Sequence, residues 1–113
     1  MSVKIRQQNG VTIVEPSGRM MGAAVSELSE VLTAEIEASD TPRILINFEN
    51  VNMMDSSGLG SLLQARAIAN RKDGRIGVVN VAKQISSLIV VTRIVNQFER
   101  FDSEDEAISE LST

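Results

Sequence analysis

Two short apolar runs, RILINF (43–48) and RIGVVNV (75–81), constrain the fold more than any other feature. The first run is almost wholly apolar, which is typical of a strand buried on both faces of a sheet. The residues between the runs begin with a polar segment and continue with a helical pattern, whose apolar side is predicted to hold Leu59, Leu62, Leu63 and Ala67. A strand, a helix and another strand in this order imply parallel pairing through a right-handed crossover.

The N-terminal segment predicts a β-hairpin. Val3 and Ile5 alternate with charged residues, and this period of two indicates a half-buried strand. Asn9-Gly10 is the strongest short signal for a hairpin turn, and Pro16-Ser17-Gly18 is expected to end the return strand. The antiparallel hairpin makes the predicted sheet a mixed one.

The remaining segments complete an α/β order. An amphipathic helix is predicted before Pro42, and residues 49–54 are expected to form a loop. A third helix is expected at 82–95, a short edge strand at 97–101, and a final helix with a capping box of Ser103 and Glu106. The prediction is one α/β domain over residues 1–113, in the order ββαβαβαβα, with a mixed four- to five-stranded sheet and helices mainly on one face. The apolar side of the first helix is predicted to hold Val25, Leu28, Leu32 and Ile36.

The composition argues against several classes of function. The chain has no cysteine and no histidine, which excludes disulfides, cysteine-based zinc sites and a Ser-His-Asp triad. Carboxylate-only metal sites remain possible, but no D-x-D-x-D-G loop is present, and we expect no enzyme activity, cofactor or metal. The net charge is −4 and the basic residues are scattered, so we expect no nucleic-acid partner. The longest apolar run, Leu88–Val91, is far too short to enter a membrane, and the N-terminus lacks a signal-peptide core, so we expect a cytoplasmic protein.

The segment DSSGLG (55–60) at the start of the central helix admits four interpretations. Asp55, Ser56 and Ser57 suit a helix N-cap, whereas Gly58 and Gly60 would suit a phosphate cradle. The cradle motifs are incomplete, because no Lys follows Gly60 and position 63 is not glycine. A catalytic serine would need a base and lacks the G-x-S-x-G elbow. The fourth interpretation is a serine that receives a phosphate.

Phosphorylation at this place has an asymmetric effect. A phosphoryl group adds a charge of about −1.5 to −2 at neutral pH. The free N–H groups and the positive end of the helix dipole are expected to tolerate that charge, so the fold is retained. A partner docked over the helix end would meet a bulky, hydrated dianion next to Asp55. The modification can therefore break a complex without unfolding the domain.

The chain resembles the STAS family, and most closely its small bacterial members, the anti-sigma factor antagonists. The resemblance is carried by VTIVEPSGRMMG (11–22), ILINFENVNMMDSSGLGSLL (44–63) and VAKQISSLIVVTRIVNQFERF (81–101). It implies that Ser57 is the phosphoacceptor, although spacing alone does not separate it from Ser56. It also implies a partner, an anti-sigma factor that is a serine kinase and carries the ATP itself. The unmodified chain would bind this partner and free the sigma factor, and a phosphatase would reverse the switch.

The resemblance also implies a docking surface and leaves alternatives open. We expect a monomer or weak dimer. The rival functions are a non-phosphorylated scaffold or lipid-transport subunit, and a small nucleotide- or anion-binding domain. The residues expected to bind the partner lie on two loops: Gly18, Met20, Met21, Gly22 and Ala24 on the first, and Met54, Asp55, Ser56, Ser57, Gly58, Leu59 and Gly60 on the second.

Two positions depart from the family pattern, and two methionine pairs stand beside the loops. Met21 occupies a place that is commonly acidic, and Asn47 one that is often Asp. Such a change at Met21 could alter phosphorylation or the choice of partner. Met20-Met21 and Met53-Met54 either fill the core or adapt to a partner surface, and we hypothesise that at least one of the four lies on the docking face.

Overall fold

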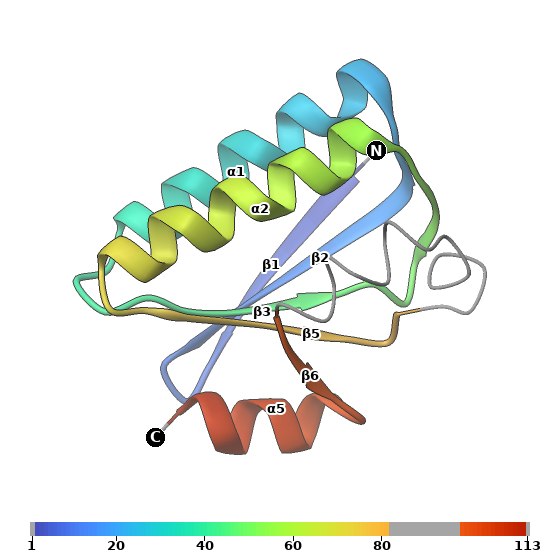
Figure 1. The fold of residues 1–113 in the computed structure, drawn as a ribbon. Coiled ribbons are helices and arrows are strands. Elements are labelled where there is room, and N and C mark those ends of the chain that lie inside the picture. Colours follow the sequence, from blue (N-terminus) through green and yellow to red (C-terminus); the bar gives the residue numbers. More distant parts are fainter. Residues whose placement is uncertain (1, 82–97, 113) are drawn as a thin grey trace.

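The computed structural model describes residues 2–81 and 98–112, which form one mixed sheet with helices on both faces (Figure 1). The sheet order is β1-β2-β3-β5-β6, and β4 pairs with β2 beside this path. The hairpin of β1 and β2 is antiparallel, and the other pairs are parallel. The strands are β1 (Ser2–Gln8), β2 (Val11–Met20), β3 (Arg43–Asn47), β4 (Val51–Met54), β5 (Arg75–Val79) and β6 (Glu99–Phe101). The helices are the 3-10 turn η1 (Gly22–Ala24), α1 (Val25–Glu37), α2 (Ser56–Arg71) and α5 (Glu104–Leu111).

The N-terminal hairpin has the predicted turn but a longer second strand. Asn9 and Gly10 have φ values of 53° and 80°, which a tight hairpin turn requires. The return strand does not end at Pro16-Ser17-Gly18 as predicted. Gly18 has a φ of 98°, and the pairing register of β2 shifts there. Ile5, predicted to lie on the apolar face of a half-buried strand, is 41% exposed.

The strand β4 lies where the sequence predicted only a loop. After Gly18, β2 pairs in parallel with β4 instead of β3, and Met20 lies opposite Met54. The Gly18 N–H donates to the Asn50 carbonyl at 2.9 Å, which holds the start of this second pairing. A four-residue strand has too little periodicity to be told from a loop, so its pairing partner determines it. With β4, the sheet has six strands, whereas four or five were predicted.

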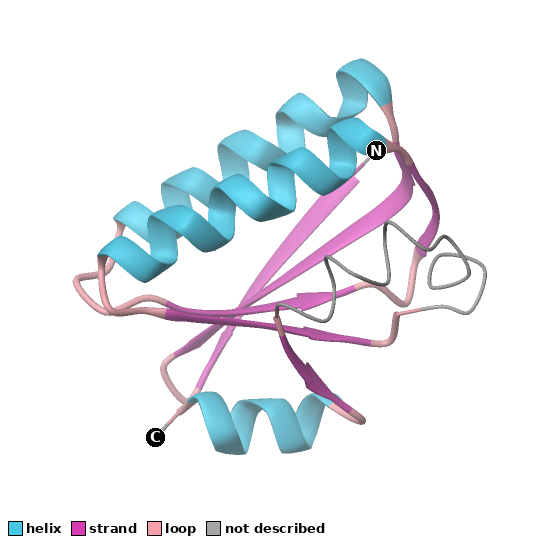
Figure 2. Cartoon of the chain, viewed as in Figure 1, coloured by secondary structure: helices cyan, strands magenta, loops and turns pink. Residues whose placement is uncertain are grey.

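Side chains of alternating residues along the central strands fill a core on each face. In β3, Ile44 and Ile46 join the core beneath α1 and α2, whereas Leu45 joins the one beneath α5. Figure 2 shows the two long helices on one side of the strands and the short C-terminal helix on the other. Helices therefore lie mainly on one face, as predicted. The helix predicted at 82–95 lies outside the described residues.

The two long helices differ in how well their buried sides were predicted. All four residues predicted for the buried side of α1 are buried; they are Val25, Leu28, Leu32 and Ile36. In α2, Leu59 and Leu62 are buried as predicted, whereas Leu63 is 37% exposed and Ala67 is also exposed, so the prediction was wrong for these two residues. The buried side of α2 uses small residues, which let its backbone approach its neighbours; its members are Gly58, Leu59, Ser61, Leu62, Ala65 and Ala69.

The C-terminal elements follow the prediction. The strand β6 lies at the edge of the sheet beside β5. Ser103 caps α5, because its Oγ accepts a hydrogen bond from the Glu106 N–H at 3.1 Å. None of the described helices has the length and apolar character needed to cross a membrane.

Candidate functional site

Asp55 caps α2 and is the central residue of the site. It has extended backbone just before the helix, and its Oδ1 accepts from the N–H groups of Ser57 and Gly58 at 3.0 and 3.1 Å. These are first-turn donors that have no partner inside a helix. The N-cap interpretation of the sequence is therefore confirmed.

Asp55 also joins the two predicted loops. Its second oxygen, Oδ2, accepts from the Gly22 N–H at 3.0 Å, and its own N–H donates to the Met20 carbonyl at 3.2 Å. The loop between β2 and α1 is thus held against the start of α2, although 33 residues separate Gly22 from Asp55. The structure brings the two predicted loops together into one surface.

The hydrogen bonds to Asp55 favour its ionised form. The N–H of Gly22 contributes most, and those of Gly58 and Ser57 add to it, so the pKa of this carboxyl is lowered from its ordinary value. At neutral pH, the surface therefore carries a fixed negative charge next to Ser56 and Ser57. No group of three or more metal-ligating side chains occurs among the described residues.

The two glycines of the motif have different environments. Gly58 is buried, and a Cβ there would lie 2.8 Å from the Met20 carbonyl oxygen and 2.9 Å from Met54 Cγ. It is glycine because α2 crosses the end of β2 closely. Gly60 is exposed, and a Cβ there would meet nothing within 4 Å. The Gly58 N–H is bonded to Asp55, which does not suit a phosphate cradle made of free backbone amides.

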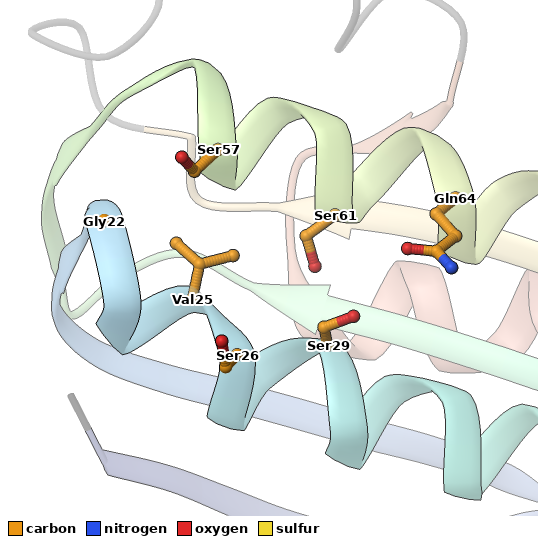
Figure 3. Close-up of a pocket in the computed structure, with 7 residues that line it drawn as sticks. All are labelled: Gly22, Val25, Ser26, Ser29, Ser57, Ser61 and Gln64. Carbon is orange, nitrogen blue, oxygen red and sulfur yellow. The ribbon is translucent and has the colours of Figure 1, made fainter.

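Ser57 is exposed on the first turn of α2, as the switch requires. It lies at the end of a groove of 310 Å³ between α1 and α2, on the side nearest Gly22 (Figure 3). Ser56 is also exposed and is not among the residues that line this groove. One expectation needs correction, because the N–H groups of Ser57 and Gly58 are already bonded to Asp55 and are not free for a phosphate.

Several residues predicted to touch a partner are buried. Met20 is 0% exposed and Met54 5% exposed, so their side chains belong to the core. Leu59 is buried in the same cluster. Met21 is half-buried, whereas Met53 is 48% exposed; the hypothesis on the four methionines included Met53, but the list of partner-binding residues did not. Strand alternation alone would not have indicated this, because Asn52 and Met53 are consecutive in β4 and both are exposed.

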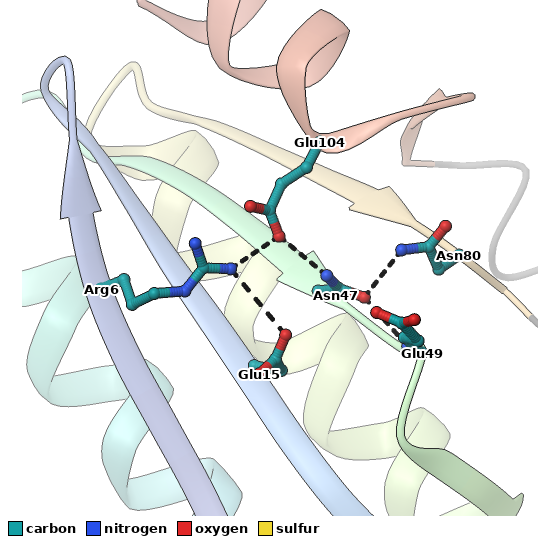
Figure 4. Close-up of polar contacts among 6 residues, drawn as sticks. All are labelled: Arg6, Glu15, Asn47, Glu49, Asn80 and Glu104. Atoms are coloured by element: carbon teal, nitrogen blue, oxygen red, sulfur yellow. Dashed lines mark hydrogen bonds and ion pairs between the residues drawn. The ribbon is translucent and has the colours of Figure 1, made fainter.

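Asn47, the second departure from the family pattern, holds a polar cluster on the α5 side of the sheet (Figure 4). Its Nδ2 donates to Glu104 Oε2 at 2.8 Å, and its Oδ1 accepts from the Glu49 N–H and from Asn80 Nδ2. Arg6 donates to the same Glu104 oxygen at 2.7 Å. The hydrogen bond from Arg6, aided by that from Asn47, lowers the pKa of Glu104.

The family model for the STAS domain matches residues 2–107 of the chain. The chain belongs to the STAS domain family. One curated relative, the anti-sigma F factor antagonist of Paenibacillus polymyxa, is 25% identical over 98% of this STAS domain and 95% of its own length. Another, the anti-sigma-B factor antagonist of Staphylococcus aureus, is 30% identical over 81% of the chain and 84% of its own length.

Solved structures share the fold of this STAS domain. The anti-sigma factor antagonist SpoIIAA in its unphosphorylated form has a TM-score of 0.74 at 24% identity, with 97% of both chains covered. The Bacillus cell fate determinant SpoIIAA in the phosphorylated form has a TM-score of 0.73 at 21% identity, covering 97% of this chain and 99% of its own. The same fold is therefore compatible with both states of that antagonist.

Proposed function

We propose that this STAS domain is an anti-sigma factor antagonist controlled by phosphorylation of Ser57. The observation that carries the proposal is the exposed Ser57 hydroxyl on a surface where Asp55 clamps two loops together. The relatives named as antagonists of anti-sigma factors cover most of the chain and support the same function. In the unmodified state, the domain binds an anti-sigma factor, which then releases its sigma factor.

The charge change explains why phosphorylation would break this complex. A phosphoryl group on Ser57 adds about −1.5 to −2 charge. Asp55, which is already ionised, lies two residues away. A partner docked here must desolvate both anions or leave the surface. The main chain needs no rearrangement, because the clamp through Asp55 does not involve the Ser57 hydroxyl.

The proposed partner supplies the chemistry. The anti-sigma factor is a serine kinase, which transfers the γ-phosphoryl group of ATP to the Ser57 oxygen with release of ADP and the hydroxyl proton. A separate phosphatase removes the group again. The STAS domain itself is then a non-catalytic, cytoplasmic binding module that works as a monomer or weak dimer.

The test uses the candidate anti-sigma kinases of the same genome. Each purified kinase is incubated with ATP and with the wild-type, Ser57→Ala or Ser56→Ala chain, and phosphate is mapped by mass spectrometry. We expect modification of wild type and Ser56→Ala, but not of Ser57→Ala. In calorimetric titrations, Ser57→Ala should bind persistently, whereas Ser57→Asp should bind at least about tenfold more weakly, because like charges across an interface are costly. Phosphate on Ser56, or equal binding by both Ser57 variants, contradicts the proposal.

A further inference from the structure

The groove between α1 and α2 contains a buried hydroxyl with no hydrogen-bond partner among the described residues. Ser61 is 7% exposed, and its Oγ forms no hydrogen bond with any described residue. A buried polar group left unsatisfied costs free energy, and each such group calls for an explanation. Figure 3 shows the Ser61 side chain directed from α2 into the groove. The hydroxyl therefore lies beside the groove with no partner among the described residues.

The groove is lined by groups that suit a phosphoryl oxygen. Ser26 and Ser29 contribute hydroxyls from α1, and Ser61 and Gln64 contribute a hydroxyl and an amide from α2. No charged residue is among the described residues that line it, and its volume is 310 Å³. Hydroxyls and amides donate to phosphate oxygens, and hydrogen bonds to an ionised acceptor are the stronger kind. The groove is therefore a donor-rich space without a negative charge of its own.

Four backbone donors near Ser57 are already in use. The N–H groups of Ser57, Gly58 and Gly22 bond to Asp55, and the Leu59 N–H bonds to the Asp55 carbonyl inside the helix. The Asp55 carboxylate repels a second anion on that side. A phosphoryl group on Ser57 thus meets repulsion toward the cap and unused donors toward the groove.

We propose that the phosphoryl group of modified Ser57 turns into this groove and accepts a hydrogen bond from the Ser61 hydroxyl. The proposal rests on the proposed function, in which Ser57 is the residue modified. Ser57 and Ser61 are four residues apart on α2, which places them one turn apart on the same side. Helical side chains lean toward the N-terminus, so Ser61 leans toward Ser57. Rotation about the Cα–Cβ bond of Ser57 then swings the phosphoryl group toward Ser61, and Ser26 and Gln64 supply further donors.

The experiment uses the full chain with phosphoserine genetically encoded at position 57, so that no kinase is needed. The pKa of the phosphate is measured by ³¹P NMR titration in the wild-type background and with Ser61→Ala. Donors favour the dianion, so removing the Ser61 hydroxyl should raise the phosphate pKa by about half a unit to one unit. Ser61→Thr retains a hydroxyl and should restore the lower value. Gln64→Ala, an exposed position, should raise the pKa by a smaller amount and provides a second test if Ser61→Ala fails to fold.

A chain with phosphoserine at position 56 is the matched control. Ser56 is absent from the groove lining, so its phosphate pKa should not respond to Ser61→Ala. Equal phosphate pKa values at position 57 with and without the Ser61 hydroxyl would overturn the inference, as would an equal response at position 56. Binding of the phosphoserine-57 chain to the anti-sigma factor is measured separately. Undiminished binding there defeats the proposed switch and leaves the groove result standing.

Discussion

The substitution Asn47→Asp replaces a hydrogen-bond donor with a carboxylate in a buried place. Asn47 is 2% exposed, and its Nδ2 lies 2.8 Å from Glu104 Oε2. In the variant, a carboxylate oxygen would face the Glu104 carboxylate at that position. The other oxygen would still accept from the Glu49 N–H and Asn80 Nδ2, so the geometry of the loop is retained. The perturbation is therefore chiefly electrostatic.

The free-energy cost of this substitution depends on whether both carboxyl groups stay ionised or one of them takes a proton. If both carboxyl groups stay ionised, two like charges about 4 Å apart repel by about 4 kcal/mol at an effective dielectric constant of about 20. If one takes a proton, holding a carboxyl of ordinary pKa about 4.3 protonated at pH 7 costs about 3.7 kcal/mol. Nearby Arg6 offsets part of the repulsion, and the Glu104 side chain is 26% exposed, so water screens it. We predict a loss of about 2–4 kcal/mol in the free energy of unfolding at pH 7.

The loss should depend on pH with a definite sign. On the protonation route, the folded variant binds one proton more than its unfolded chain. Its free energy of unfolding therefore falls as the pH rises, by about 1.4 kcal/mol per unit. Wild-type Glu104 has a lowered pKa, so its contribution is present above the unfolded-state pKa and lost only in more acidic solution. The stability that the variant loses relative to wild type should therefore become smaller as the pH is lowered from 7 toward the ordinary carboxyl pKa.

Urea unfolding at neutral and mildly acidic pH measures these quantities. The matched control is the double variant Asn47→Asp with Glu104→Gln, in which an amide can again donate to a carboxylate across the same contact. It should recover most of the loss at pH 7. A single variant within about 0.5 kcal/mol of wild type at pH 7 would refute the reasoning, since that is the range of a neutral surface change. A large loss that is the same at both pH values would indicate a steric cause.

Two further predictions concern the start of α2. Gly58→Ala should lose about 1–3 kcal/mol of unfolding free energy, because its Cβ would press on Met20 and Met54. Gly60→Ala lies in open space and should gain up to about 1 kcal/mol. Equal urea midpoints for the two variants would contradict the close crossing of α2 and β2. The lowered pKa of Asp55 means that its charge stabilises the fold above the ordinary value of 3.8, and that this contribution is lost as the pH falls through the lower folded-state value. The stability advantage of wild type over Asp55→Asn, followed by urea midpoints, should therefore shrink in acid, and an advantage independent of pH would count against the cap.

Much of the candidate site was predictable because its determinants are local. The cap at Asp55, the exposed serines on the first turn of α2, and the buried side of α1 follow from residue type and spacing over a few positions. The resemblance to the STAS family directed attention to Ser57 in particular. The sequence left open whether Met20 and Met54 fill the core or face a partner, because the answer depends on the strand β4 and its long-range pairing with β2.

The sequence by itself determined the hairpin turn, the alternation of strands and helices, and the position of a polar cap at the start of α2. Each of these depends on torsional preferences and hydrogen bonds within about one turn of chain. Only the tertiary structure decided that Asp55 also binds Gly22, that the buried side of α2 is rich in small residues, and that Ser61 has no partner among the described residues. These features arise where segments far apart in the chain pack together, and close packing is set by the neighbours a residue meets rather than by its own preference.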